Sequence, residues 1–328
     1  MLGTWRLLLA LMVALTHVGV TIAGRDMGVT AVVCFYLISG YVMTGLIRTH
    51  YAGLPRARHF YADRFLRLWP HYLAVAGITL IWFWWTGSRP YFLAHAPGAI
   101  DAFNNLTIVP LNYYMFNGSD RFALVPTGWS LGAEIQFYAI APLAVLNARV
   151  RGLVLVGSAA VFVLACFGVV HPEWYGYRLP AGVLFMFMLG SMLYDAHAAS
   201  GSSRAADRIV LWHMLSVALL AGALAATHRL FWAFNVEVLS GLFLGLPLLH
   251  VLARLPRQGW DTRLGDLAYG IFLNHMTVQL FLFTRMPVTP ATTVLYIALT
   301  IVMAFVLFRA IEQPIVAMRY TLRAAKAK

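Results

Sequence analysis

Residues 27–47 read MGVTAVVCFYLISGYVMTGLI and contain no charged side chain. An α-helix needs about 20 consecutive apolar residues to cross the hydrocarbon core of a bilayer, so this stretch predicts a membrane-spanning helix. Nine similar runs give, with this one, candidate spans near residues 4–22, 27–47, 70–86, 127–147, 152–170, 178–195, 208–226, 231–252, 266–284 and 291–311. The sequence therefore predicts an all-α fold, a polytopic integral membrane protein with about ten transmembrane helices.

The composition of the whole chain agrees with this interpretation. Of the 328 residues 61% are hydrophobic and 11% charged, whereas soluble domains are usually about one quarter charged. An aromatic content of 14% excludes a disordered chain. Only the connections 48–69 and 87–126 are long, so we expect a single transmembrane domain over residues 1–328. Cys34 and Cys166 lie inside apolar runs and form no metal-binding or disulfide pattern.

The positive charges are distributed unevenly between the two sets of loops. The chain carries 24 Lys and Arg against 12 Asp and Glu, a net charge of +12. With both termini in the cytoplasm, sixteen of the 24 face the cytoplasm, among them Arg257, Lys326 and Lys328, and six lie in the opposite loops. The positive-inside rule selects this orientation, so no nucleic-acid partner is needed to explain the charge. The first run resembles a signal peptide, but His17 within it favours a retained helix.

Arg6 and His17 are eleven residues apart in the first span. At about 100° per residue the two side chains point the same way, roughly 16 Å apart along the helix axis. An ionisable side chain at membrane depth is costly unless it faces a polar interior, which makes each of them a candidate functional residue. The alternative is a snorkelling arginine and a hydrogen-bonded structural histidine.

Glu134 lies near the outer end of the fourth span, in the stretch Trp129-Ser-Leu-Gly-Ala-Glu-Ile-Gln-Phe-Tyr138. Ser130, Glu134 and Tyr138 are spaced i, i+4, i+8 and share one helix face. A carboxylate at the depth of His17 could orient or neutralise an imidazole, as acid–base catalysis requires. The alternative is an interhelical salt bridge or hydrogen bond.

Arg64 and Arg67 are three residues apart in the cytoplasmic segment 48–69, on a predicted short helix. Guanidinium groups bind phosphate bidentately, so the two could hold a phosphate-rich cofactor. Topological sorting or contact with anionic lipid is the alternative. His275 and Glu237 are weaker candidates that interhelical hydrogen bonding explains more often than catalysis, and His213 is expected to be structural.

Six sequence blocks occur in the order typical of one family. They are Arg6-x10-His17, Phe35–Tyr41, Arg64–Pro70, Trp129–Tyr138, Tyr269–His275 and Glu312-Gln-Pro314. In these blocks the chain resembles the acyltransferase 3 family of integral-membrane O-acyltransferases, which acylate surface polysaccharides, exopolysaccharides and related acceptors. Two positions depart from the pattern: Asp63 stands where the family often has a further arginine, and Asn274 stands where it often has tryptophan.

The resemblance implies a multi-pass enzyme of the inner (plasma) membrane. Its donor substrate would be a cytoplasmic acyl-CoA, most often acetyl-CoA, with no permanently bound cofactor and no metal. Its acceptor would be a hydroxyl of a saccharide or lipid-linked saccharide. Arg64 and Arg67, helped by Arg6, would hold the CoA phosphates. His17 would be the general base, with Glu134 tuning or orienting it, in a direct transfer or through an acyl-histidine. The other residues expected to contact the substrate are Ser39, Trp129, Ser130, Tyr138 and His275.

Three other classes of protein are compatible with a polar membrane interior. A transporter or flippase for a lipid-linked saccharide would move its substrate without acyl-CoA and would not need the Arg6–His17 geometry, and we find no internal repeat that favours it. A different membrane acyltransferase acting on lipids or proteins fits the early blocks poorly. A receptor or assembly scaffold would bind without turnover.

Overall fold

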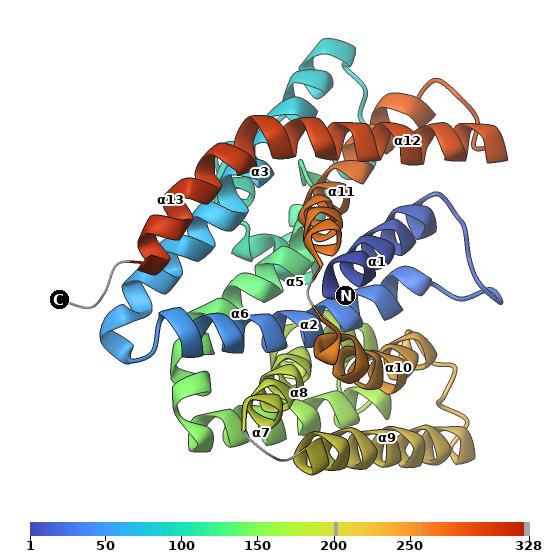
Figure 1. Cartoon of the computed structure of the whole chain (residues 1–328). Helices are drawn as coiled ribbons and strands as arrows, with labels where there is room; N and C mark the ends of the chain where they lie inside the picture. Colours follow the sequence, from blue (N-terminus) through green and yellow to red (C-terminus); the bar gives the residue numbers. More distant parts are fainter. Residues whose placement is uncertain (200–202, 257, 325–328) are drawn as a thin grey trace. The chain divides into compact units, whose positions relative to one another are not determined.

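The computed structural model describes residues 1–199, 203–256 and 258–324, which form helices joined by short connections (Figure 1). Within these ranges extended pairing is limited to two isolated bridges, Ile22–Arg25 and Leu93–Phe122. The prediction of an all-α fold is therefore confirmed. Arg257, Lys326 and Lys328, which the sequence analysis assigns to the cytoplasmic side, lie outside the described residues.

The helices are labelled in chain order and have the following bounds. They are α1 Leu2–His17, α2 Met27–His50, η1 Leu54–Arg56, α3 Ala57–Thr86, α4 Ala99–Thr107, η2 Val109–Tyr113, α5 Tyr114–Asn117, η3 Ser119–Arg121, α6 Gly128–Leu146, α7 Ala148–Cys166, η4 Trp174–Arg178, α8 Pro180–Ala198, α9 Ser203–Ala226, α10 Asn235–Arg254, α11 Gly259–Phe283, α12 Pro290–Leu307, η5 Phe308–Glu312 and α13 Gln313–Ala324.

Seven helical segments within the described residues are long and apolar enough to cross a membrane. They are Met27–His50, Gly128–Leu146, Ala148–Cys166, Trp174–Ala198, Arg204–Ala226, Asn235–Arg254 and Pro290–Thr321. The chain is therefore a multi-pass membrane protein. The three remaining predicted runs lie on α1, which is a shorter apolar helix, and on α3 and α11, which mix charged and polar residues with apolar ones.

The cytoplasmic segment and the third predicted span form one continuous helix. The sequence divides this stretch at Pro70, because charged residues precede the proline and apolar residues follow it. In the structure α3 runs for 30 residues through Pro70. The proline removes one backbone donor from the helix but does not end it. Arg64 and Arg67 accordingly lie in the first half of α3 rather than on a separate short helix.

The described helices form two compact units, each assembled from separate parts of the chain. The first unit contains Met1–Leu2, Ile22–Phe60 and Gln136–Gln258. The second unit contains Gly3–Thr21, Tyr61–Ile135 and Gly259–Lys328. Most of the candidate site residues, including Arg6, His17 and His275, belong to the second unit.

In the first unit α2 packs on α8 and α10, and α7 packs on α8. The imidazole Nε2 of His213 lies 2.9 Å from the carbonyl oxygen of Leu242 and joins α9 to α10, which is the structural role predicted for this histidine. Glu237 of α10 lies 3.5 Å from the guanidinium of Arg25, which precedes α2. The weaker candidate Glu237 therefore has an ion-pair partner within this unit.

In the second unit α1 and α3 both run parallel to α11. At the start of α1 the backbone N–H of Gly3 donates to Asp261 of α11 over 3.0 Å, and at its end Gln279 of α11 donates to the carbonyl of His17 over 2.9 Å. For α3, the Tyr269 hydroxyl donates to the carbonyl of Leu68 over 2.8 Å. Further along the same two helices, the hydroxyls of Thr79 and Thr277 lie 2.8 Å apart.

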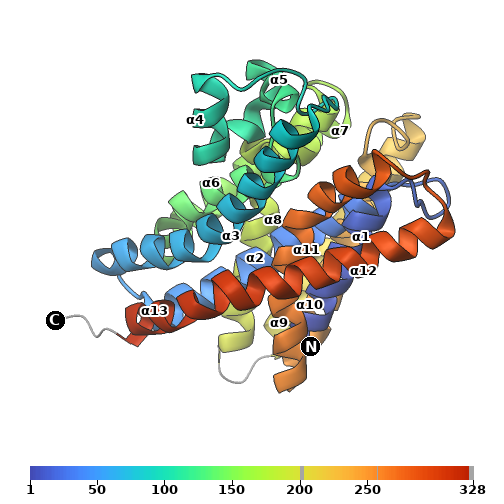
Figure 2. The same ribbon diagram turned by 90° about the horizontal axis from the view of Figure 1, so that it is seen from above.

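α12 runs antiparallel to α11 and also contacts α1. The Asn274 amide donates to the carbonyl of Thr300 over 3.3 Å, and the Tyr296 hydroxyl donates to the carbonyl of Ala14 over 3.2 Å. Both views show α12 continuing through η5 into α13, which lies beside the first half of α3 (Figures 1 and 2). The C-terminal helix is therefore brought back to the charged half of α3.

The outer connection 87–126 folds into the short helices α4, η2, α5 and η3. Asn105 organises it, because its amide nitrogen donates to the carbonyl of Phe122 over 2.9 Å and its amide oxygen accepts from the N–H of Leu124 over 2.8 Å. The side chain of Asn105 is buried. A buried amide with both ends hydrogen-bonded helps to give this connection a defined structure, together with buried apolar side chains such as Leu93 and Phe122.

Candidate active site

Two histidine rings lie against each other in the second unit. His17 is the last residue of α1, and its ring centroid is 5.0 Å from that of His275 on α11. His275 is fully buried, whereas His17 is exposed. Sequence reasoning identifies both residues but expects Glu134, rather than a second imidazole, beside His17. We call His17 and His275 the histidine pair.

Both rings of the histidine pair hold a proton on the same nitrogen. Nδ1 of His17 lies 2.8 Å from the carbonyl oxygen of Val13, and Nδ1 of His275 lies 3.1 Å from that of Ile271. A carbonyl oxygen can only accept a hydrogen bond, so each Nδ1 must be the donor. A neutral imidazole carries one N–H, and therefore each Nε2 keeps a lone pair.

The lone pair of His275 is buried without a donor. Within the described part of the chain, neither Nε2 of His275 nor the amide oxygen of Asn274 has a hydrogen-bond partner. A buried acceptor that is left unsatisfied costs free energy, about 1–3 kcal/mol per group. Such atoms in a native fold require an explanation, and one is a role toward a substrate or a transferred proton.

Arg6 lies against α11 where that helix has a glycine. A Cβ added to Gly265 would overlap both Nη2 of Arg6 and the Cα of Gly3. The glycine therefore provides the space for the guanidinium and for the close approach of α1 and α11. Since Arg6 faces Gly265 and His17 faces His275 on the same helix, the prediction that both side chains point the same way is confirmed.

Asp261 fixes the first turn of α1. Its carboxylate accepts from the backbone N–H groups of Gly3 over 3.0 Å and of Thr4 over 2.8 Å, and also from the Thr4 hydroxyl over 2.8 Å. Burial alone would raise the pKa of Asp261, but the hydrogen bonds from Thr4 and Gly3 outweigh it and hold the pKa below its usual value. An anion at a helix N-terminus also interacts favourably with the helix dipole.

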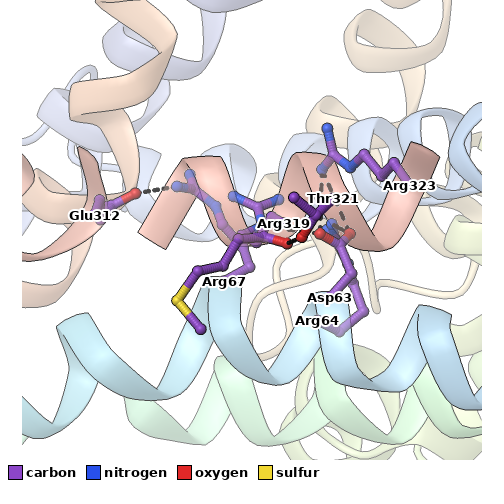
Figure 3. Close-up of polar contacts among 8 residues, drawn as sticks. Asp63, Arg64, Arg67, Glu312, Arg319, Thr321 and Arg323 are labelled. Atoms are coloured by element: carbon purple, nitrogen blue, oxygen red, sulfur yellow. Dashed lines mark hydrogen bonds and ion pairs between the residues drawn. The ribbon is translucent and has the colours of Figure 1, made fainter. Parts of the chain in front are cut away.

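Asp63 is a fully buried carboxylate that binds three guanidinium groups (Figure 3). Arg64 pairs with it from the same helix, Arg319 Nε donates to it over 2.9 Å, and Arg323 Nη2 lies 3.4 Å from both carboxylate oxygens. Burial alone would raise the pKa of Asp63, but these guanidiniums outweigh it and hold the pKa below its usual value. Sequence reasoning treats Asp63 only as a departure that removes an arginine, whereas the structure makes it the centre of a charged cluster.

Arg67 has a different carboxylate partner. It pairs with Glu312 of η5, whose other oxygen lies 2.6 Å from Nδ1 of His71. The guanidinium of Arg67 also lies 5.0 Å from the ring centroid of Tyr269. Arg64 and Arg67, which the sequence analysis expects to grip one phosphate together, are therefore each held by a separate carboxylate.

The start of α6 contributes Trp129, Ser130 and Glu134 to the second unit. The charge of Glu134 acts on Arg6, at the opposite end of α1 from His17, although less strongly than those of Asp266 and Asp261. The Ser130 hydroxyl donates to the carbonyl of Thr127 over 2.9 Å, a bond local to the start of the helix. The predicted substrate contacts Ser39 and Tyr138 belong to the first unit.

The polar residues of the second unit thus gather at two places along α1 and α11. We call the set Arg6, Arg64, Arg67, Arg319 and Arg323 with their carboxylates the arginine end. At the arginine end the guanidinium groups can bind an anion. At the histidine pair two Nε2 lone pairs can accept a proton. The arrangement suits a reaction in which an anionic substrate is bound at one end and a hydroxyl is deprotonated at the other.

Sequence reasoning does not assign a role to five residues in or beside the arginine end. Asp63, His71, Glu312, Arg319 and Arg323 meet there from helices that are distant in sequence. A signal exists for Glu312, which stands in one of the six blocks. The spacing of Glu312, Arg319 and Arg323 is a second signal, because intervals of seven and eleven residues place side chains on one helix face.

Comparisons with known proteins agree with the blocks. The acyltransferase 3 family model, described as an acyltransferase domain, matches residues 2–309. An uncharacterized protein of Aquifex aeolicus (strain VF5) is 34% identical over 153 residues, which cover 46% of this chain and 68% of that protein. No solved structure matches the chain.

Proposed function

The chain belongs to the acyltransferase 3 family, and we propose that this membrane acyltransferase moves an acyl group from cytoplasmic acyl-CoA to a saccharide hydroxyl. Acetyl is the proposed acyl group. The observation that carries the proposal is the histidine pair, whose Nδ1 atoms are bound to backbone carbonyls and whose Nε2 atoms are left as acceptors. A general base for a hydroxyl needs such a free lone pair.

The transfer requires one proton acceptor. His17 Nε2 takes the proton of the acceptor hydroxyl, whose oxygen attacks the thioester carbonyl carbon. The carbon–sulfur bond then breaks, and the CoA thiolate takes the proton back from His17 to leave as a thiol. The products are an O-acyl saccharide and free CoA. In the two-step alternative His17 Nε2 attacks the thioester first, and the carbon–sulfur bond breaks to release the CoA thiolate. The hydroxyl then displaces the acyl group from the imidazole, and its proton goes to the CoA thiolate.

His275 and Glu134 are proposed to act through charge. When His17 carries the transferred proton, the neighbouring Nε2 of His275 is an acceptor that stabilises the imidazolium. Glu134 contributes to balancing the charge of Arg6, after the stronger contributions of Asp266 and Asp261. Tuning of His17 by Glu134 is the alternative, which predicts that Glu134→Gln changes the pH dependence of turnover rather than the affinity for the donor.

The arginine end is the proposed donor site. Arg6, Arg64 and Arg67 would bind the phosphates of acyl-CoA, so that the thioester is directed along α1 and α11 toward the histidine pair. The parallel course of α1, α3 and α11 supports this arrangement, because it places the starts of all three helices at the arginine end.

The same parallel course supports the proposed topology. If ten helices cross the membrane with both termini in the cytoplasm, the first, third and ninth spans run outward and the tenth runs inward. α1, α3 and α11 are parallel in the second unit, and α12 is antiparallel to α11. We therefore propose that the arginine end faces the cytoplasm of a cell bounded by this inner (plasma) membrane.

The proposal is tested by mass spectrometry of surface glycans from cells with the gene, without it, or with single variants. We expect acylation to be lost without the gene and in His17→Ala, and to be retained in His95→Ala, a control whose imidazole is 49% exposed. Immunoblots of the membrane fraction verify that each variant is inserted and abundant. Acylation that persists without the gene, together with altered export of the saccharide, would support a transporter or flippase instead.

A further inference from the structure

The C-terminal helix α13 brings two arginines to the charged half of α3 (Figure 3). Arg319 and Arg323 both bind Asp63, which already pairs with Arg64. None of the six sequence blocks includes either arginine, and the family match ends at residue 309, before α13 begins. The function of these two side chains is therefore not explained by the common pattern of the family.

The charges around Asp63 are not balanced. Three guanidinium groups bind one carboxylate, which leaves a local surplus of two positive charges. The four strongest charges acting on Arg319 are those of Arg67, Arg64, Arg323 and Asp63, three cations and one anion. Two further carboxylates lie nearby: Glu312 is engaged with Arg67 and His71, and Asp266 interacts most strongly with the charges of Arg67 and Arg6.

The surplus charge is largely buried. The side chains of Arg64, Arg319 and Arg323 are 7%, 12% and 21% exposed. Bringing cations of like charge together away from water is unfavourable unless an anion compensates them. A purely structural ion pair with Asp63 would need a single arginine. The other two guanidiniums indicate a site for an anionic ligand.

The cluster also has donors that Asp63 does not use. Each guanidinium carries five N–H groups in a planar fork, whereas a carboxylate offers about four lone-pair positions to all three. Nε of Arg323 is buried and has no hydrogen-bond partner within the described residues. A planar, preoriented guanidinium with an unpartnered N–H group, such as that of Arg323, is suited to a phosphate, which accepts several N–H groups at once.

We propose that Arg319 and Arg323, together with Arg64, form a phosphate-monoester site that binds the 3′-phosphate of the acyl-CoA donor. Asp63 holds the three guanidiniums in place. A phosphate monoester carries about −1.5 to −2 charges at neutral pH, which matches the surplus at Asp63. This inference rests on the proposed function and deepens it, because it makes α13 a part of the donor site.

The test compares CoA with 3′-dephospho-CoA, two ligands that differ only in this phosphate. Calorimetry on the purified full-length protein in nanodiscs gives the ratio of their dissociation constants. We expect the wild type to prefer CoA by roughly ten- to a hundredfold, the range of one or two charge-assisted hydrogen bonds. In Arg319→Gln/Arg323→Gln the ratio should fall to near one, while the affinity for 3′-dephospho-CoA stays the same.

Arg309→Gln is the matched control, because Arg309 is an exposed arginine of the neighbouring turn and contacts Gln313. It should keep the wild-type ratio. General destabilisation cannot imitate the expected result, because it would weaken both ligands alike. An unchanged ratio in the double variant, with normal CoA binding, would overturn this inference and leave the proposed function intact. Failure of the wild type to bind CoA would overturn both.

A lipid headgroup is the other source of a phosphate at this position. The measurements are therefore repeated in nanodiscs of neutral phosphatidylcholine and in nanodiscs that contain anionic phosphatidylglycerol. The preference for CoA should persist in both. If the double variant keeps the preference for CoA and changes only how the measured affinities depend on phosphatidylglycerol, the cluster is a lipid site and the inference is wrong.

Discussion

The arginine end and the histidine pair accommodate polar side chains inside a membrane protein in opposite ways. At the arginine end the charges are kept, and buried carboxylates such as Asp63 and Glu312 hold the guanidiniums. At the histidine pair the groups can remain neutral, each ring is tied by one backbone bond, and the second nitrogen of His275 is buried without a partner. The first arrangement suits the binding of an anion, and the second suits the transfer of a proton.

Because of this difference, single substitutions can distinguish the binding of the donor from the catalytic step. A change at the arginine end should alter the affinity for the donor, and a change at the histidine pair should alter turnover. The strongest test of the comparison is a substitution that abolishes one property and leaves the other intact.

His17→Ala should have the largest effect. Loss of a general base typically lowers the rate by about 10²–10⁴-fold. We expect turnover of acetyl-CoA by the purified protein to fall by about a thousandfold, while calorimetry gives a dissociation constant for CoA within roughly twofold of the wild type. His95→Ala should leave both unchanged. Weakened CoA binding in His17→Ala would mean that the two ends do not act separately.

Asp63→Asn should have the next largest effect, on stability rather than on turnover. It leaves three partly buried guanidiniums without their carboxylate, and breaking a buried ion pair costs about 3–5 kcal/mol. We expect the midpoint of denaturation in detergent to fall accordingly, and added CoA to recover part of the loss. Asp120→Asn is the control, because its bond to Tyr91 is exposed.

The contribution of Asp63 should also depend on pH. Its pKa in the folded protein lies below its usual value, so it stabilises the fold above the unfolded pKa of about 4 and ceases to do so as the pH falls through the folded pKa. The stability difference between the wild type and Asp63→Asn should therefore be constant near neutral pH and shrink below about pH 4. The check is a series of denaturation measurements from neutral pH to below pH 4. A stability difference that stays the same over this whole pH range would contradict the role of Asp63 as a buried carboxylate.

His275→Ala should have an intermediate effect that is confined to turnover. Removing the Nε2 acceptor leaves the His17 imidazolium without its neighbour, and we expect kcat to fall by roughly ten- to a hundredfold. The affinity for CoA should not change. An equal loss in kcat and in CoA affinity would indicate that His275 supports only the packing of α11.

Gly265→Ala should have the smallest effect. The added methyl group would overlap Arg6 and Gly3, and overpacking of this kind costs about 1–3 kcal/mol. We expect KM for acetyl-CoA to rise by roughly three- to tenfold with little change in kcat. Gly259→Ala, on the same helix but with open space around its Cα, should behave as the wild type. A fall in kcat without a change in KM would mean that Arg6 affects catalysis at the histidine pair rather than binding of the donor.

The sequence predicts local features of this molecule well and its long-range pairings poorly. The apolar runs and the common face of Arg6 and His17 follow from helical periodicity, which depends only on neighbouring residues. The pairing of His17 with His275 depends on how α1 packs on α11, which spacing does not encode. Asp63 illustrates the limit best, since its importance arises from Arg319 and Arg323, more than 250 residues later.

The contacts between α1 and α11 have a consequence for biosynthesis. Gly3 and Asp261 are 258 residues apart in the chain, and the members of the histidine pair have the same separation. At about 5–20 residues per second, a ribosome takes roughly 13–50 seconds to reach α11 after completing α1. Until α11 is made, the first turn of α1 lacks its hydrogen bonds to Asp261, and Arg6 lacks the space that Gly265 provides. The arginine end and the histidine pair can therefore assemble only after α11 has been synthesised, and a chain released before α11 contains neither of them in complete form.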